Sequence, residues 1–251
     1  MTAQQLAVLL SKLEQHHGSI DFAEPTDPFE LIVYTNCGYP PSQQNCRKGF
    51  EALKSEIGLA ADALLCASDR ALAKALQAGG IVPELRAARV KLIARLVTED
   101  FGGDLRSALS ATKEARKALK RFPTIGDPGV DKILLFCAGI PVAAVPSNCP
   151  HVPLRLGVGV ERGSYAASYR SVQQELTRLL PGDAAAMQRA YLLFRHHGKE
   201  LCHRTAPLCD ECPVAPICPY FRSRGGAARA APKPIRRGKS RRVRAPRNRN
   251  G

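Results

Sequence analysis

The sequence of 251 residues predicts an all-α fold, and three observations support this prediction. Apolar residues recur at steps of three and four over long segments, which is the period of an amphipathic helix. Strand-like alternation is scarce, and its best example, residues 30–34, fits the start of a helix after Pro28 equally well. Glycines and prolines stand between the apolar segments. With 45% hydrophobic residues the chain can bury a core of one large or two small domains, which excludes general disorder.

Each helix is expected from an apolar stripe and from the residues that end it. The stripe from Leu85 to Leu96 ends at Gly102-Gly103, and the stripe from Tyr165 to Leu179 ends before Pro181. We interpret these stripes as core faces rather than cofactor sites. The expected helices are 2–16, 28–38, 43–56, 69–77, 83–101, 111–121, 128–138, 164–180 and 184–197.

Charge is concentrated at the C-terminal end. The net charge is +15, but twelve of the lysines and arginines, and no acid, lie between residues 221 and 251. The remaining body is nearly neutral, with 25 basic against 22 acidic residues. Because a segment of Arg, Lys, Pro, Ala and Gly cannot offset the entropy of ordering by burial, residues 221–251 are expected to form a disordered basic tail.

Cysteine usage and the N-terminus predict a soluble protein of the cytoplasm. Nine cysteines are an odd number and do not form a complete set of intrachain disulfides. The N-terminal residues do not have the layout of a signal peptide. The longest apolar stretch, 133–146, is too short to cross a bilayer, so no membrane partner is expected.

Four cysteines form one compact run with metal-ligand character. Its spacing is C-x6-C-x2-C-x5-C, and four thiolates so close in sequence can surround one soft metal centre. A zinc site usually pairs two short C-x2–4-C knuckles, and only one is present here, so a [4Fe–4S] cluster fits better than zinc. The other five cysteines have no ligand spacing and are interpreted as small apolar residues. The expected ligands are Cys202, Cys209, Cys212 and Cys218.

The segment 190–202 followed by this spacing resembles the cluster loop of endonuclease III-type DNA glycosylases. The resemblance implies a [4Fe–4S] cluster on these cysteines, and a loop in which His203 and Arg204 approach the DNA backbone. A second motif, residues 122–136 (FPTIGDPGVDKILLF), resembles the helix-hairpin-helix of the same superfamily, although Thr124 replaces the first glycine of its hairpin. The resemblance covers about residues 20 to 220.

The resemblance implies a two-lobed helix-hairpin-helix DNA glycosylase fold. Residues 22–135 would form a six-helix-type DNA-binding lobe, residues 1–21 with 136–220 the cluster lobe, and residues 221–251 the tail. In the hairpin, main-chain groups at a helix start would bind a DNA phosphate, and a monovalent cation is allowed there. The DNA-binding residues implied are Pro123, Thr124, Ile125 and Gly126.

The catalytic residues of the family do not carry over. An ungapped match places Pro128 where bifunctional members have a lysine, and Pro146 where members have an aspartate. Neither proline can form a Schiff base, stabilise an oxocarbenium-like transition state or activate water. Nearby alternatives are Asp127, Lys132 and His151. Each also has a structural interpretation: a helix N-cap for Asp127, a solvated position for Lys132, and a simple hydrogen bond for His151. Ser147 and Asn148 are expected to cap the next helix.

The loop that fills the gap left by an extruded base in the family is not matched either, since Pro40 stands at its glutamine position. Candidates for this base-probing role are Tyr39, Gln43 and Gln44. The interpretation we favour for this segment is structural, a Pro-Pro turn followed by a helix with Ser42 as N-cap.

These observations lead to two functional hypotheses. The first is a monomeric protein of base excision repair that binds duplex DNA of the nucleoid and removes a flipped, damaged or mispaired base as a monofunctional N-glycosylase, without a lyase step. The alternative is a catalytically silent relative that recognises damaged or distorted DNA. A purely electron-transferring iron–sulfur protein would not need this helical body. The basic tail would add salt-sensitive attraction to DNA in either case. The alternatives for the tail are a solubilising segment without a specific role and contact with RNA or the ribosome.

Overall fold

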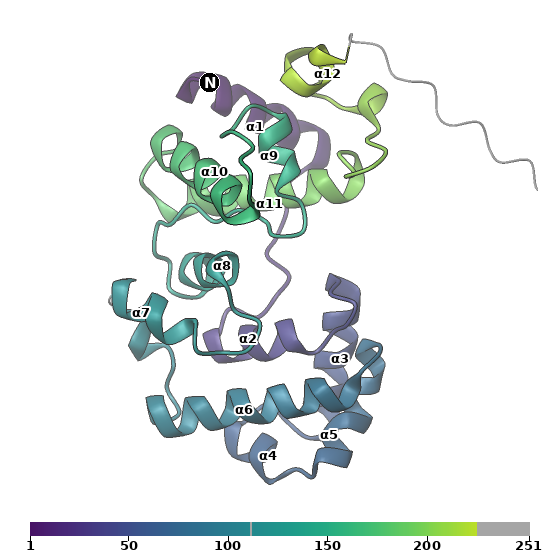
Figure 1. Cartoon of the computed structure of the whole chain (residues 1–251), viewed down its shortest axis with the longest axis vertical. Helices are drawn as coiled ribbons and strands as arrows, with labels where there is room; N and C mark the ends of the chain where they lie inside the picture. The colour runs from purple at the N-terminus through teal and green to yellow at the C-terminus, as the bar shows by residue number, and fades with distance from the viewer. Residues whose placement is uncertain (111, 225–251) are drawn as a thin grey trace, which may run out of the picture.

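In the computed structural model, which describes residues 1–110 and 112–224, the regular structure is helical apart from one isolated bridge between Tyr39 and Gly80 (Figure 1). The α-helices are α1 (Ala3–His17), α2 (Pro28–Asn36), α3 (Gln43–Glu56), α4 (Ala61–Cys66), α5 (Asp69–Leu76), α6 (Pro83–Phe101), α7 (Thr112–Leu119), α8 (Asp127–Cys137), α9 (His151–Arg155), α10 (Tyr165–Leu179), α11 (Ala184–Glu200) and α12 (Pro219–Ser223). No described helix is both long and apolar enough to cross a bilayer.

The predicted all-α fold is confirmed, and the helices expected from apolar stripes are present with small shifts at their ends. The bounds of α3 and α6 are those expected, and residues 30–34 lie in α2, whose N-cap is Asp27. Helices α4 and α9 were missed, because both are short and neither has a side-chain N-cap. The expected disorder is wrong for the first residues of the tail, where α12 forms and Phe221 packs against the core. Residues 225–251 lie outside the described part.

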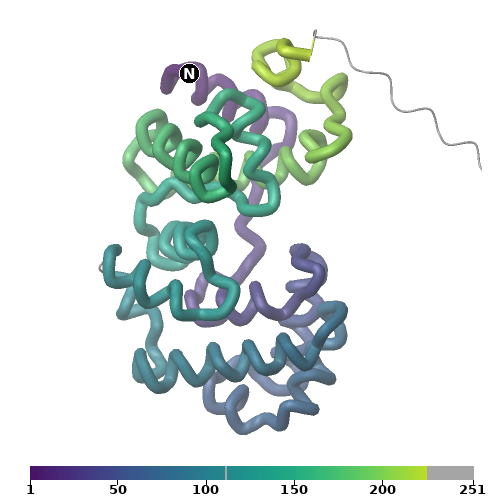
Figure 2. Tube along the Cα trace, in the orientation of Figure 1, coloured from purple at the N-terminus to yellow at the C-terminus, as the bar shows by residue number. Residues whose placement is uncertain are grey.

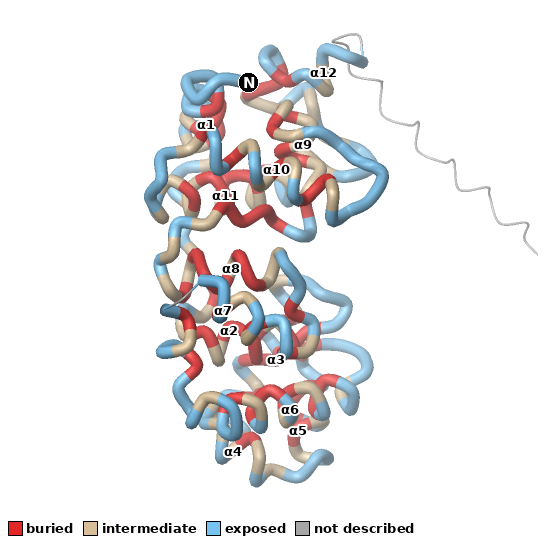
Figure 3. The backbone as a smooth tube through the Cα atoms, turned by 60° about the vertical axis from the view of Figure 1, so that its left-hand side comes forward, coloured by how far each residue is buried: buried red, intermediate tan, exposed pale blue. Residues whose placement is uncertain are grey.

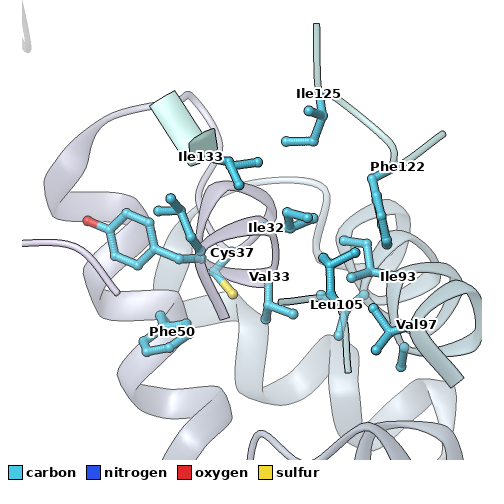
Figure 4. Packing of buried hydrophobic residues seen from close by; sticks show 14 of the residues in the cluster. Ile32, Val33, Cys37, Phe50, Ile93, Val97, Leu105, Phe122, Ile125 and Ile133 are labelled. Carbon is cyan, nitrogen blue, oxygen red and sulfur yellow. The ribbon is translucent and has the colours of Figure 1, made fainter. Parts of the chain in front are cut away.

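Buried side chains form two separate hydrophobic cores. The two groups of helices can be followed in Figures 1 and 2, and Figure 3 colours the buried residues of each group red. The core of the first lobe is built from α2–α7 and part of α8, and Figure 4 shows how its side chains meet below the 122–125 turn. The core of the second lobe is built from α1, α9–α11 and the cysteine loop. Helix α8 belongs to both, because Leu134 packs in the first core and its neighbour Leu135 in the second. The two lobes therefore share α8 as a common wall.

A buried arginine fixes the loop between α2 and α3. The Arg86 guanidinium is 1% exposed and donates hydrogen bonds to the carbonyls of Cys37 (2.6 Å), Leu76 (2.7 Å) and Gly80 (2.7 Å). Because these carbonyls come from the loop after α2, from the end of α5 and from the segment that follows it, the charge is satisfied only when these parts of the chain lie together. Gly79 allows this close approach, since a Cβ there would lie 1.9 Å from the Cys37 carbonyl oxygen. The start of α3 is thereby held in place.

A buried carboxylate fixes α8 between its neighbours. Asp131 is 0% exposed and accepts hydrogen bonds from Tyr169 Oη (2.5 Å) and Gln173 Nε2 (2.7 Å) on α10 and from the Arg116 guanidinium on α7. A buried carboxylate without partners is costly, so this set of donors ties the first lobe to the second.

Replacing Asp131 by alanine is expected to lower the free energy of unfolding by about 3 kcal/mol, because Arg116 and Tyr169 lose a buried partner. Urea unfolding followed by circular dichroism measures the loss. The matched control is Glu175→Ala on α10, which removes an ion pair with the exposed Arg178 and should change the free energy of unfolding little, because solvent screens that pair. Equal losses in the two variants would contradict the role given to Asp131.

Candidate nucleic-acid site and cysteine cluster

The turn between α7 and α8 has the features of a helix-hairpin-helix. Thr124 adopts a left-handed backbone (φ 67°), which explains why other hairpins place a glycine there. Its hydroxyl donates to Asn36 Oδ1 (3.2 Å), and Asn36 Nδ2 donates to the Pro123 carbonyl (3.4 Å), so α2 holds the turn. Ile125 is buried beneath it, whereas Thr124 and Gly126 are exposed at the start of α8. Exposed main-chain groups at a helix N-terminus can bind a phosphate.

The predicted N-cap role of Asp127 is wrong. Gly126 is the N-cap and makes no side-chain cap bond, because the chain enters the helix one residue earlier than expected. Asp127 is the first helical residue, and its half-exposed carboxylate pairs with Lys120 (2.5 Å) on the α7 side of the hairpin.

A pocket of about 420 Å³ lies between the lobes, and we call it the interlobe pocket. The hairpin and α8 form one wall, the start of α3 a second, and α11 a third. A neighbouring pocket of about 360 Å³ shares five lining residues with it (Pro41, Ser42, Gln43, Asn148 and Arg195) and continues to His196 and Lys199. The residues lining the interlobe pocket include Tyr34, Ser42, Gln43, Thr124, Gly126, Pro128, Lys132, Ser147, Asn148, Tyr191 and Arg195.

Three charged residues meet at the wall of the interlobe pocket. Glu24, from the segment that connects α1 to α2, accepts from Lys132 Nζ (2.8 Å) through one carboxylate oxygen and pairs with Arg195 Nη2 (2.5 Å) through the other. The expected solvated position for Lys132 is wrong, since 14% of its side chain is exposed, because the amine turns inward toward this carboxylate. Burial alone would raise the pKa of Glu24, but the charges of Lys132 and Arg195 outweigh burial and lower it. Glu24 is therefore an ionised carboxylate at neutral pH.

The segment after α8 places its residues differently from expectation. Pro146 is buried and does not line the interlobe pocket, whereas Ser147 and Asn148 are exposed and do line it. Their predicted capping role is wrong, because α9 begins only at His151, with Pro150 at its N-cap. His151 does not line the pocket either. Its Nε2 lies 2.7 Å from the Cys202 carbonyl, so the ring contacts the cysteine loop, and burial lowers its pKa.

The base-probing candidates are divided between two places. Gln43 lines the interlobe pocket, and Gln44 lines the neighbouring pocket. Tyr39 is 45% exposed but lines neither, because its main chain is bound by Gly79 and Ile81. The predicted Ser42 N-cap is confirmed: its hydroxyl accepts from the Asn45 amide (3.0 Å).

The four cysteines of the run surround one small hollow, together with Arg155 and His197. Arg155 orders the loop by donating to the carbonyls of His203 (2.7 Å) and Arg204 (2.7 Å), and its Nη1 lies 3.5 Å from Cys202 Sγ. Among the described residues, no group of three or more His, Cys, Asp or Glu side chains lies close enough together to bind one metal ion. A [4Fe–4S] cluster differs from a single ion, since each cysteine binds its own iron. Four sulfurs around one hollow fit such a group.

Sequence reasoning missed three residues of this region. Glu24 and Arg195 were missed because their only signal is charge, and the chain separates them by more than 170 residues. His197 lies between α1 and the cysteine loop, and burial lowers its pKa to about 4, so its ring is neutral at pH 7.

Comparisons with known proteins agree with this architecture. No family model matches the chain. It is 24% identical over 200 residues to endonuclease III of Thermotoga maritima, and the matched region covers 80% of this chain and 86% of that protein. Endonuclease III of Bacillus subtilis is 24% identical over 133 residues, 53% of this chain and 55% of that protein.

Solved structures give the same fold. A trapped endonuclease III–DNA covalent intermediate superposes with a TM-score of 0.71 at 17% identity, covering 90% of this chain and 99% of that one. A thermostable thymine-DNA glycosylase superposes with a TM-score of 0.69 at 19% identity, covering 88% and 98%. The chain therefore has the helix-hairpin-helix DNA glycosylase fold, and the resemblance to endonuclease III predicted from its motifs is confirmed.

Replacing Glu24 by glutamine is expected to cost about 3 kcal/mol at pH 7, because two cations lose a buried carboxylate. The pKa of Glu24 is lower in the folded than in the unfolded chain, so its contribution is present above the unfolded pKa of about 4.3 and is lost as the pH falls through the folded pKa. The stability difference between the wild type and the variant should therefore shrink below about pH 4.3. Unfolding at pH 7, 5 and 3.5 tests this, and a constant difference would contradict it.

Proposed function

We propose that this chain is a base-excision-repair protein that binds duplex DNA and removes a damaged or mispaired base as a monofunctional N-glycosylase. The observation that carries this proposal is the interlobe pocket beside the hairpin. A protein that acts on a base in duplex DNA must extrude the nucleotide into a pocket and bind its flanking phosphates. Here helix α8 serves both requirements. The hairpin at its start offers a phosphate-binding site, and Lys132, about one turn later, lines the pocket for the nucleotide.

The pocket has the size and lining expected for a base. A volume of about 420 Å³ lies within the range of small-molecule sites. Tyr34 and Tyr191 contribute aromatic surface, while Gln43, Ser147 and Asn148 contribute polar groups that can bind the edge of a base. His196 and Lys199 continue the pocket with basic groups, which suits the phosphates on either side of an extruded nucleotide.

The chemistry assigned to this pocket is hydrolysis without a lyase step. Pro128 lines the pocket at the position matched to the family lysine and offers no amine. The amine of Lys132 is engaged by Glu24 and is not a free nucleophile. Among the described residues that line the pocket, Glu24 is the only carboxylate, and we propose it in place of Asp127 and His151 as the anionic group near the sugar.

One observation favours the alternative, a catalytically silent relative that binds damaged or distorted DNA. Only 3% of the Glu24 side chain is exposed, because Lys132 and Arg195 cover it. The pocket therefore presents cations, and the developing positive charge of an oxocarbenium-like transition state would meet them unless DNA binding rearranges the three residues.

The cofactor proposed is a [4Fe–4S] cluster on Cys202, Cys209, Cys212 and Cys218, with a structural role in the second lobe. Arg155 would hold the loop that carries His203 and Arg204 toward DNA. The hairpin main chain, from Pro123 to Gly126, would bind a phosphate, directly or through a monovalent cation. We expect a monomer acting on the nucleoid in the cytoplasm.

Single-turnover glycosylase assays test the proposed reaction. Excess protein is mixed with duplexes carrying uracil, thymine glycol, 8-oxoguanine, hypoxanthine or alkylated purines, and each sample is split between direct and alkali-treated gels. We expect strand breaks on one lesion class, and only after alkali, because hydrolysis leaves an intact abasic strand. Glu24→Gln should lower the rate at least tenfold, and Asp127→Asn is the matched control. Tight binding without breaks on any lesion would replace this proposal by the silent binder.

Removing residues 225–251 tests the role of the basic segment. These residues carry ten lysines and arginines and no acid, so their loss should weaken binding to undamaged duplex DNA. The slope of log affinity against log salt should also become shallower, because fewer counterions are released. Fluorescence anisotropy between 50 and 200 mM salt measures both. An unchanged slope would show that these residues do not contact DNA.

A further inference from the structure

Two histidines from opposite ends of the chain form a hydrogen-bonded path to one sulfur of the cysteine run. His17 lies at the end of α1 and is partly exposed, whereas His197 on α11 is 1% exposed. The distance from His17 Nε2 to His197 Nδ1 is 3.1 Å. The distance from His197 Nε2 to Cys212 Sγ is 3.6 Å.

The direction of this path follows from the sulfur. A cysteine that binds iron has lost its proton, so Cys212 Sγ can only accept a hydrogen bond. His197 Nε2 must then be the donor. Because a neutral imidazole carries one N–H, His197 Nδ1 is left as an acceptor, and it accepts from His17 Nε2. Each bond therefore sets the orientation of the next.

We propose that His17 is a positioning residue, which fixes the tautomer of His197 so that His197 donates a hydrogen bond to the sulfur of Cys212 and raises the reduction potential of the iron–sulfur cluster. This inference rests on the proposed cofactor. A donor to a ligand sulfur withdraws negative charge and so favours the more reduced cluster. Without His17 no donor occupies the Nδ1 lone pair of His197, so the ring can hold its proton on Nδ1 instead, and the hydrogen bond to Cys212 Sγ is then lost.

The path also gives α1 a role beyond packing. Helix α1 precedes the first lobe in sequence but packs in the second, where its buried leucines contact the α11 region. A purely structural His17–His197 contact would tie α1 to α11 and affect stability. The proposed role predicts, in addition, a change in the electronic properties of the cluster.

Voltammetry of the full-length, cluster-loaded protein in the absence of DNA provides the test. His17→Phe keeps an aromatic ring but removes the donor, and its midpoint potential should shift to a lower value than that of the wild type. His17→Gln retains an N–H and should restore part of the shift. His16→Phe is the matched control, because His16 is exposed and its ring meets the His17 ring edge to face (4.7 Å between centroids) without a hydrogen bond to it among the described contacts.

Two further measurements keep the outcome decisive. His197→Phe should shift the potential in the same direction, and adding His17→Phe to it should produce no further shift, because His17 acts through His197. Since His197 is buried and its variant can fail to load the cluster, ¹⁵N NMR of the histidine rings is the second readout. It should show the Nε2–H tautomer of His197 in the wild type and a mixture in His17→Phe.

The experiments distinguish a failure of the cofactor proposal from a failure of the role proposed for His17. Wild-type protein purified anaerobically without bound iron would overturn the cofactor proposal and this inference with it. A loaded wild type whose potential is unchanged by His17→Phe, or whose His197 carries its proton on Nδ1, would overturn this inference alone.

Discussion

The burial of the Asp131 carboxylate is the constraint on which the rest of the structure depends. Its donors come from α7 and α10, so its charge is satisfied only when α8 lies between the two lobes at one rotational setting. Consecutive residues on a helix point about 100° apart, so the same setting turns Lys132 toward Glu24 and Arg195. The position of the hairpin at the start of α8 follows from this setting as well. One buried charge thus couples the packing of the lobes to the geometry of the pocket.

The interlobe pocket combines a familiar architecture with an unfamiliar set of charges. Prolines occupy both positions where the resemblance implies catalytic side chains, and only Pro128 of these lines the pocket. An ionised carboxylate is nevertheless present, supplied by the segment between α1 and α2 and held by cations from α8 and α11. Both oxygens of this carboxylate already bind Lys132 and Arg195. If the pocket is catalytic, the three residues must therefore rearrange when DNA binds; if they do not rearrange, the pocket can only recognise DNA. The two functional hypotheses differ on this one physical point.

The cysteine loop is held from outside by side chains other than its own cysteines. Arg155 binds the main chain of the loop at two carbonyls, and its guanidinium stacks on the Tyr220 ring at 4.4 Å. His197 approaches the loop from α11 and is itself contacted by α1. The N-terminal helix, the cysteine loop and α12 consequently form one packed unit, in which His17 on α1 is connected through His197 to the sulfur of Cys212.

The sequence by itself determined the helices with clear apolar stripes, the cysteine spacing and the hairpin, because each of these is encoded within about thirty neighbouring residues. An ungapped match with the family also predicts that Pro128 and Pro146 stand at the positions of its catalytic lysine and aspartate, but it does not predict that Pro146 is buried. Only the tertiary structure decided the partners of Lys132, the inward turn of Glu24 and the contact between His17 and His197. These pairs are more than 100 residues apart, and no local pattern specifies them. They form because buried charges and buried imidazole nitrogens must find partners, and packing of the whole chain decides which partners are within reach.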